Sequence, residues 1–517
     1  MVTFVLLLAA ITALAFWYLR WHFSTFKRLG LQGPEPSIIA GNLPEIMKKG
    51  QLQAMIDWSK QYGRVFGYYE GWTPVIAVAD PKILRQILVK DFDNFRSRKP
   101  FPLAPRKALG LFLENGHQWK QSRSILTPAF STGKIKKMFP VIDSMVDNLE
   151  ENIKVKSAKA KPFDIYRYDR FRLKGLFVLD SIYQGLTLDV IGRCAFGLQT
   201  NAQTDPKDEF LTNIRFLFSG LSKTCILYLV MLIPIFQYFV FALKNLVIIF
   251  GMNPVVWLRN QLREIIRIRK EMGSSHNAID LVQLMLFPST KYSTGAEKQR
   301  SMTDREIVAQ SLTFLLAGYE TTSAVLSFLT DLLSRNKEVQ DRLCAEIDGV
   351  IRDGHVDYDN VQQLPYFDMV INEVCRLYPT ASLIVTRQAA ESRIYNGVHI
   401  PAGMAIQANV WALHHDGHFW QNPEAFIPER FSPTYKEKIV PYSFLPFGVG
   451  PRSCIGERFA MLEIKLTIAR ILKNYRFTRP HDSDSKHFSI CDNLDYGLYR
   501  ERCLVNVYPV LSITFMI

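Results

Sequence analysis

The feature that most constrains the fold of this chain is the segment Phe444–Met461 (FLPFGVGPRSCIGERFAM). A loop containing Gly448 and Gly450 leads to Cys454, after which a helical pattern begins. Glycine permits tight bends, so backbone N–H groups can point at the sulfur. The N-terminus of a helix would further stabilise a thiolate, and Arg452 stands where it can pair with an anionic group. On this segment alone, a buried structural cysteine beside a turn remains the alternative.

The spacing Phe447-x-x-Gly450-x-Arg452-x-Cys454-x-Gly456 resembles the haem-binding loop of the cytochrome P450 superfamily at every defined position. Three other segments resemble the family in its order and with its separations: Trp119-x-x-x-Arg123, Ala317-Gly318-x-Glu320-Thr321-Thr322, and Glu373-x-x-Arg376 with Arg430 in Pro428–Phe431. The resemblance covers essentially the whole chain after its N-terminal segment. It implies a mainly α fold with small β-sheets, built as a single core around haem. AGYETTS and PFGVGPRSCIGERFA are most similar to the animal microsomal branch, which includes drug- and steroid-oxidising enzymes and thromboxane synthase.

The resemblance also implies a role for each matching residue. Cys454 would be the axial ligand of the iron of haem b, donating electron density that favours O–O cleavage. Glu320 and Thr321 would form an acid–alcohol pair that relays protons toward the iron, and Gly318 would leave room for dioxygen. Glu373 and its two arginines would form a buried structural triad. The haem propionates would be held by Arg98, Trp119, Arg123, Arg387 and Arg452.

This pattern favours a monooxygenase that hydroxylates or epoxidises lipophilic substrates such as xenobiotics, steroids or fatty-acid-like molecules. Thromboxane synthase rearranges a peroxide without dioxygen or reductant and departs from the acid–alcohol pattern, whereas this chain keeps Glu320-Thr321. A peroxide isomerase on the same fold and a non-catalytic haem-binding or sensor protein are the two alternatives.

Electrons are expected from outside the chain, because its sequence contains neither a Gly-rich dinucleotide fingerprint nor a flavin domain. We expect NADPH to supply them through NADPH–cytochrome P450 reductase, with cytochrome b5 as a further partner. By the resemblance, four lysines on the thiolate side of the haem would dock the reductase: Lys120, Lys134, Lys136 and Lys137. An ordinary solvated lysine cluster is the alternative.

The N-terminal run Val2–Leu19 is uncharged and almost wholly apolar, and at helical rise it spans a hydrocarbon core. The aromatic residues Trp17, Tyr18 and Trp21 lie at its C-terminal end, and the positive charges of Arg20, Lys27 and Arg28 come after the run. A cleaved signal peptide would carry its charge before the run. We therefore expect a membrane anchor at 1–21, a basic, proline-rich hinge at 22–40 and a catalytic domain at 41–517. The positive-inside rule puts the catalytic domain in the cytosol. The resemblance to the microsomal branch implies a single-pass protein of the endoplasmic reticulum membrane.

A second apolar run, Cys225–Leu243, is interrupted by Pro234 and flanked by lysines, and we interpret it as an interfacial segment. It would line an apolar substrate pocket together with 101–112, 314–317 and 381–385, in which Ser382 is the polar handle. An apolar pocket beside the bilayer predicts lipophilic substrates, although any protein core is apolar.

Composition excludes several other classes of protein. The net charge of +14 suits an anionic partner such as lipid headgroups or an acidic protein, but no nucleic-acid motif is present. The seven cysteines are odd in number and form no C-x-x-C pair. They therefore indicate a reducing compartment rather than a disulfide framework or a zinc site.

Local patterns predict several elements. Residues 65–69 and 75–78 flank Gly71-Trp72 as a hairpin, and Asn396-Gly397 suits a type I′ turn within 394–400. Asp80-Pro81 begins a short helix. The capping box Thr303-x-x-Glu306 begins the longest helix, which runs to about Asn336.

Overall fold

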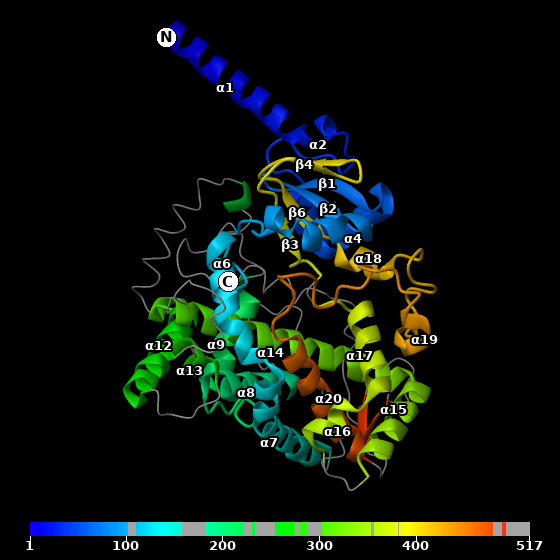
Figure 1. Ribbon diagram of the computed structural model, residues 1–517. Helices are drawn as coiled ribbons and strands as arrows, with labels where there is room; N and C mark the ends of the chain where they lie inside the picture. The colour runs from blue at the N-terminus through cyan, green and yellow to red at the C-terminus, as the bar shows by residue number, and fades with distance from the viewer. Residues whose placement is uncertain are drawn as a thin grey trace.

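The computed structural model describes residues 1–101, 110–157, 182–221, 230–232, 254–273, 280–287, 302–352, 356–380, 382–478 and 489–492. Helix α1 (Val2–Phe23) and the short α2 (Thr25–Arg28) project from a β-rich part of the molecule, and a larger helical part lies on its other side (Figure 1). Except for 230–232, the apolar run 225–243 lies outside the described residues.

The β-rich part is built on a four-stranded sheet in the order β1-β2-β6-β3. Strands β1 (Val65–Glu70) and β2 (Thr73–Val78) form the predicted hairpin, with Gly71 at φ +62 in its turn. Strand β6 (Ala405–Ala408) pairs parallel with β2 and antiparallel with β3 (Thr386–Gln388).

Two smaller hairpins complete the strands. In the first, β4 (Arg393–Tyr395) pairs with β5 (Val398–Ile400). Asn396 and Gly397 connect them at φ 48 and 83, which confirms the predicted turn because a type I′ turn needs positive φ at both positions. In the second, β7 (Tyr475–Thr478) pairs with β8 (Ser489–Asp492).

The longest helix, α14 (Asp304–Arg335), crosses the helical part of the molecule (Figure 1). Thr303 and Glu306 form the predicted capping box, and Asn336 is the C-cap residue that follows the helix. Asp80 caps α5 as expected, because its carboxylate accepts from two backbone N–H groups of the first turn. The other helices are α3 (Leu43–Lys49), α4 (Gln51–Tyr62), α5 (Pro81–Arg85), α6 (Gly116–Leu126), α7 (Thr132–Ser157), α8 (Ile182–Phe196), α9 (Glu209–Leu221), α12 (Pro254–Met272), α13 (Leu281–Leu286), α15 (Lys337–Val350), α16 (Tyr358–Gln362), α17 (Pro365–Leu377), α18 (Val410–His415), α19 (Pro433–Lys436) and α20 (Glu457–Asn474).

The apolar core is divided between these two parts. One large cluster fills the helical part around α14 and α20. Alternate residues of β2 enter two smaller clusters, Ile76 and Val78 in one and Val75 and Ala77 in the other. Because successive strand residues point to opposite faces, the two clusters lie on opposite faces of the sheet. The prediction of a mainly α fold with small sheets is confirmed.

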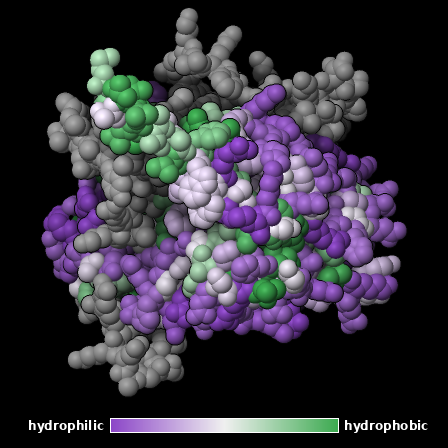
Figure 2. Space-filling view, turned by 90° about the horizontal axis from the view of Figure 1, so that it is seen from above, coloured by the Kyte–Doolittle hydropathy of each residue, from purple (hydrophilic) through white to green (hydrophobic). Residues whose placement is uncertain are grey.

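Two described helices, α1 and α14, are long and apolar enough to cross a membrane. The most apolar window of α14 is 78% buried, so that helix belongs to the core, whereas that of α1 is 0% buried. Viewed from the side on which α1 projects, hydrophobic residues gather at the upper left and in smaller groups near the centre of a mainly hydrophilic face (Figure 2).

The C-terminal end of α1 is seated on the sheet. His22 Nε2 lies 2.9 Å from the carbonyl oxygen of Trp72, and the Tyr69 hydroxyl donates to the carbonyl of His22 at 3.1 Å. Phe23 and Phe26 are buried against Tyr69. The first residues of the expected hinge at 22–40 are therefore packed onto the body.

Candidate active site

The loop before α20 holds Cys454 by its own backbone. The N–H of Cys454 donates to the carbonyl of Phe447 at 2.8 Å, and Arg123 of α6 donates to the carbonyl of Ser453 at 2.9 Å. Gly450 has φ +76, and a Cβ there would lie 2.1 Å from the carbonyl oxygen of Leu88. No other residue fits that position, so the bend that presents the cysteine requires glycine.

When only protein atoms are considered, Cys454 is exposed to solvent. Burial among the surrounding protein atoms nevertheless raises the pKa of its thiol, whereas the backbone N–H groups of Gly456 and Glu457 and the guanidinium of Arg123 lower it. The sulfur therefore borders an internal opening rather than the outer surface. The amides that face it come from the residues that begin α20, and not from the loop glycines Gly448 and Gly450.

Arg98, Arg387 and Arg452, distant in sequence, form one buried cluster. Arg387 lies on β3 and is 2% exposed. Arg452 donates to the carbonyls of Arg96 at 2.7 Å and Glu114 at 2.5 Å. The Nε atoms of Arg98 and Arg387 are buried and have no hydrogen-bond partner among the described residues.

Trp119 and Arg123, both on α6, join this cluster to the cysteine loop. The guanidinium of Arg452 lies over the ring of Trp119, 4.4 Å from its centroid. Arg123 reaches Ser453, as described above. All six residues that the sequence assigned to the cofactor thus lie around one region of the molecule.

Helix α14 and the cysteine loop line one small cavity, with a volume of about 30 Å³. Its lining residues include Thr321, Phe447 and Ala460. The hydroxyl of Thr321 donates to the carbonyl of Ala317 at 2.7 Å, one turn earlier in the helix.

Glu320 lies on a different face of α14. It is 3% exposed, and Gln184 of α8 donates to its carboxylate at 3.4 Å. No hydrogen bond joins Glu320 to Thr321 among the described residues, so the structure does not pair the expected acid with the alcohol directly.

The expectation that Gly318 leaves room for dioxygen is wrong in this structure. A Cβ at Gly318 would lie 2.9 Å from Cγ1 of Ile191. Because Gly318 has no side chain, α8 can pack closely against α14 at this position. Helix packing, not ligand space, explains the residue.

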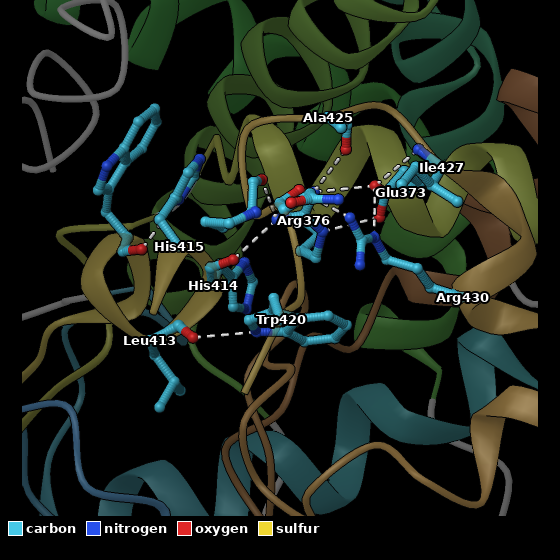
Figure 3. A network of polar contacts seen from close by, with 12 residues as sticks. Glu373, Arg376, Leu413, His414, His415, Trp420, Ala425, Ile427 and Arg430 are labelled. Atoms are coloured by element: carbon cyan, nitrogen blue, oxygen red, sulfur yellow. Dashed lines mark hydrogen bonds and ion pairs between the residues drawn. The ribbon is translucent and has the colours of Figure 1, made fainter. Parts of the chain in front are cut away.

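The expected charge triad is confirmed (Figure 3). Glu373 and Arg376, both fully buried, form a bidentate pair at 2.7 and 2.8 Å, and Arg430 Nε reaches Glu373 at 3.2 Å. Arg376 also donates to the carbonyl of His414 at 2.9 Å. The His414 Nε2 in turn accepts from the N–H of Leu445, at the start of the cysteine loop.

Comparison with known proteins is consistent with this geometry. A family model described as Cytochrome P450 matches residues 31–492. The chain belongs to the cytochrome P450 family. Cytochrome P450 3A56 of Fundulus heteroclitus is 35% identical over 482 residues, 92% of each chain. Cytochrome P450 3A5 of Homo sapiens is 35% identical over 481 residues, 92% of this chain and 90% of the relative. Cytochrome P450 3A29 of Sus scrofa is 34% identical over 485 residues, 91% and 90% respectively.

This P450 is therefore a monooxygenase of the animal microsomal branch that uses haem b, and NADPH supplies such enzymes through a reductase. The buried arginines fit that cofactor. Burial, with the charges of Arg98 and Arg387, lowers the pKa of Arg452 to about 7. Since guanidinium groups stay protonated in proteins, the cluster needs anionic counter-charge. The two propionates of haem b would supply it.

Sequence reasoning missed two buried polar residues beside the cluster. Gln310 of α14 donates to the Glu114 carboxylate at 2.8 Å and accepts from the N–H of Leu111 at 2.7 Å. Burial raises the pKa of Glu114 to about 7. The pair ties the loop before α6 to α14. The only sequence signal was the presence of polar residues within two mainly apolar runs, 111–114 and 307–316.

Proposed function

We propose that this P450 is a membrane-anchored monooxygenase that receives electrons from NADPH through a reductase and hydroxylates or epoxidises lipophilic substrates. The observation that carries the proposal is that Thr321 lines one cavity together with Pro446 and Phe447 of the loop that leads to Cys454. Haem with a thiolate ligand supplies the activation of dioxygen.

In this proposal Cys454 is the iron ligand, and the amides of Gly456 and Glu457 favour its thiolate form by lowering the pKa of the thiol against the effect of burial. The propionates are held by the residues already assigned to them: Arg98, Trp119, Arg123, Arg387 and Arg452. The unpaired Nε–H groups of Arg98 and Arg387 support this assignment, because a buried donor left without an acceptor is costly.

Thr321 is the proposed proton donor on the substrate side. In the structure its hydroxyl donates a hydrogen bond to the carbonyl of Ala317. Rotation about χ1 would release that bond and turn the hydroxyl toward the cavity. Glu320 would reach it only through water or a second rotamer, since its carboxylate accepts from Gln184.

The anchor is α1, with the catalytic domain on the cytosolic side of the endoplasmic reticulum membrane. Its 22 residues extend about 33 Å at helical rise, enough to cross the hydrocarbon core. Arg28 lies over the ring of Trp21 at 4.5 Å, which puts a cation and an aromatic ring at the interface end.

The thiolate side offers a basic surface to an acidic reductase and to cytochrome b5. Lys120 and Lys137 are exposed, and neither forms an ion pair among the described residues, whereas Lys136 pairs with Asp359 at 2.7 Å. On the substrate side, the hydroxyl of Ser382 is buried without a partner in the described part of the chain, which suits the proposed polar handle.

The deciding experiment is the ferrous–CO spectrum of the purified protein, followed by turnover with reductase and NADPH. We expect a strongly red-shifted Soret band, lost in Cys454→Ser, and product formation that consumes NADPH and dioxygen. A band typical of imidazole-ligated haem would contradict thiolate ligation. Turnover of a peroxide without NADPH or dioxygen would instead favour the isomerase, and a thiolate spectrum without turnover of any lipophilic compound would favour a sensor.

A further inference from the structure

A surface groove lies between α12 and the first turns of α14, away from the cysteine loop. Its volume is about 720 Å³. Apolar side chains of Ile266, Val308 and Ala309 contribute to the lining. Among the residues that the structure describes, the charged lining residues are five cations and two carboxylates: Arg259, Arg263, Arg267, Lys270, Arg305, Glu271 and Asp304.

The two carboxylates of the groove are already neutralised. Arg267 binds Glu271 at 2.6 Å, and also Glu264 at 2.5 Å. Lys270 binds Asp304 at 2.5 Å. Positive charge in excess of these pairs therefore remains in the groove.

The excess charge belongs to three arginines. Arg259 and Arg263 are one turn apart on α12, and Arg305 stands in the first turn of α14. Among the described residues Arg259 and Arg305 have no hydrogen-bond or ion-pair partner, and Arg263 donates only to Asn260. Burial and the charges of Arg263 and Arg305 lower the pKa of Arg259. Like charges gathered in this way are unfavourable unless an anion binds between them.

We propose that this groove is a binding site for an anionic amphiphile, with a sulfate or phosphate head among Arg259, Arg263 and Arg305. Guanidinium groups bind such heads through paired, charge-assisted hydrogen bonds. The apolar body of the ligand would lie over Ile266 and Val308.

The site is separate from the place of oxidation. Ala309, on the groove, precedes Thr321 by twelve residues of one helix, roughly 18 Å at 1.5 Å per residue. A ligand in the groove would therefore act as an effector or a bound lipid. This inference does not depend on the proposed catalytic cycle, because binding is measured without turnover.

The test uses the full-length holoenzyme in nanodiscs of neutral phosphatidylcholine. Decyl sulfate is added below its critical micelle concentration, and the heat of binding is measured by calorimetry. The heat measured with empty nanodiscs is subtracted. We expect one equivalent to bind, and Arg259→Gln and Arg305→Gln each to weaken binding about tenfold. Arg267→Gln is the matched control. It removes a charge from the same groove, but one already paired with two glutamates, so binding should change less than threefold.

Equal weakening by all three substitutions would overturn the proposal, since it would indicate general attraction to a basic surface. Equal affinity for decanol would overturn it as well. Should Arg259→Gln fail to fold, the exposed Arg305 still provides the comparison. Discs containing phosphatidylserine separate two sources of the ligand: competition with decyl sulfate identifies the bilayer, and unchanged affinity identifies a soluble amphiphile.

Discussion

The side chain of His414 is hydrogen-bonded to the backbone of Leu445: the imidazole Nε2 accepts from the N–H of Leu445 at 2.8 Å. Since the carbonyl of His414 accepts from Arg376, this residue connects the buried charge triad to the loop that carries Cys454. The triad therefore positions the cysteine loop through an imidazole that must remain neutral to accept.

His414 should make stability depend on pH. Burial, with the charges of His415 and Arg376, lowers its pKa from 6.5 to about 3. Below pH 6.5 the unfolded chain binds a proton that the folded chain does not, so stability is complete above pH 6.5 and falls as the pH drops toward 3. His414→Gln keeps an acceptor but does not titrate. Between pH 7 and 5 the wild type should lose roughly 2 kcal/mol more than this variant in denaturant unfolding.

The exposed His399 supplies the control for that measurement, because His399→Gln should leave the wild-type profile unchanged. Parallel curves for wild type and His414→Gln would show that His414 does not titrate in this window.

Removing the Thr321 hydroxyl should uncouple electron use from product formation. Thr321→Ala should lower product formed per NADPH several-fold and raise release of hydrogen peroxide, because protons then arrive only from solvent. Thr321→Ser keeps the hydroxyl and its bond to Ala317, and should retain most of the coupling. Product, NADPH and peroxide are measured in one reaction; unchanged coupling in the alanine variant would assign the proton donor elsewhere.

Breaking the triad should destabilise the fold and loosen the cofactor. Glu373→Gln leaves the buried charge of Arg376 without its carboxylate, at a cost of about 3–5 kcal/mol. Haem content on purification and the unfolding midpoint should both fall. Glu264→Gln, which removes an exposed partner of Arg267, is the control and should change neither. If Glu373→Gln kept full haem content and stability, the triad would not position the loop.

The lysines of the thiolate side should differ in their effect on the reductase. Lys137→Glu reverses an exposed charge without an ion pair in the described structure, so the KM for reductase should rise several-fold and more steeply at low salt. Lys136→Gln removes a charge already balanced by Asp359 and should have a smaller effect. The rate at which reduced cytochrome b5 transfers an electron to the same variants tests the second partner. Equal effects of the two substitutions would argue for a diffuse basic surface.

The sequence was sufficient to predict those elements that are determined by interactions between residues close together in the chain. The Asn396-Gly397 turn and the Thr303 capping box depend on residues within a few positions of one another, and both are present. The Glu373–Arg376 spacing, three residues apart on a helix, predicted a pair, but only the family resemblance supplied Arg430 as the third member.

Contacts between distant segments could not be predicted in the same way. Glu114 meets Gln310, and His414 meets Leu445, only because tertiary packing brings their segments together. The role of Gly318 was misjudged for the same reason, since its sequence context does not reveal that Ile191 lies against it.

Phe23 and Phe26 pack against the sheet and so fix the rotation of α1 about its axis relative to the catalytic domain. Each residue inserted into α1 would rotate the domain by about 100° around the helix axis and shift it by about 1.5 Å along that axis. Insertion of a full turn should restore the original face to the bilayer, whereas insertion of two residues should present the opposite one. The composition of α1 would then determine whether the protein is held in a membrane, and its register would determine which side of the domain a reductase on the same membrane can reach.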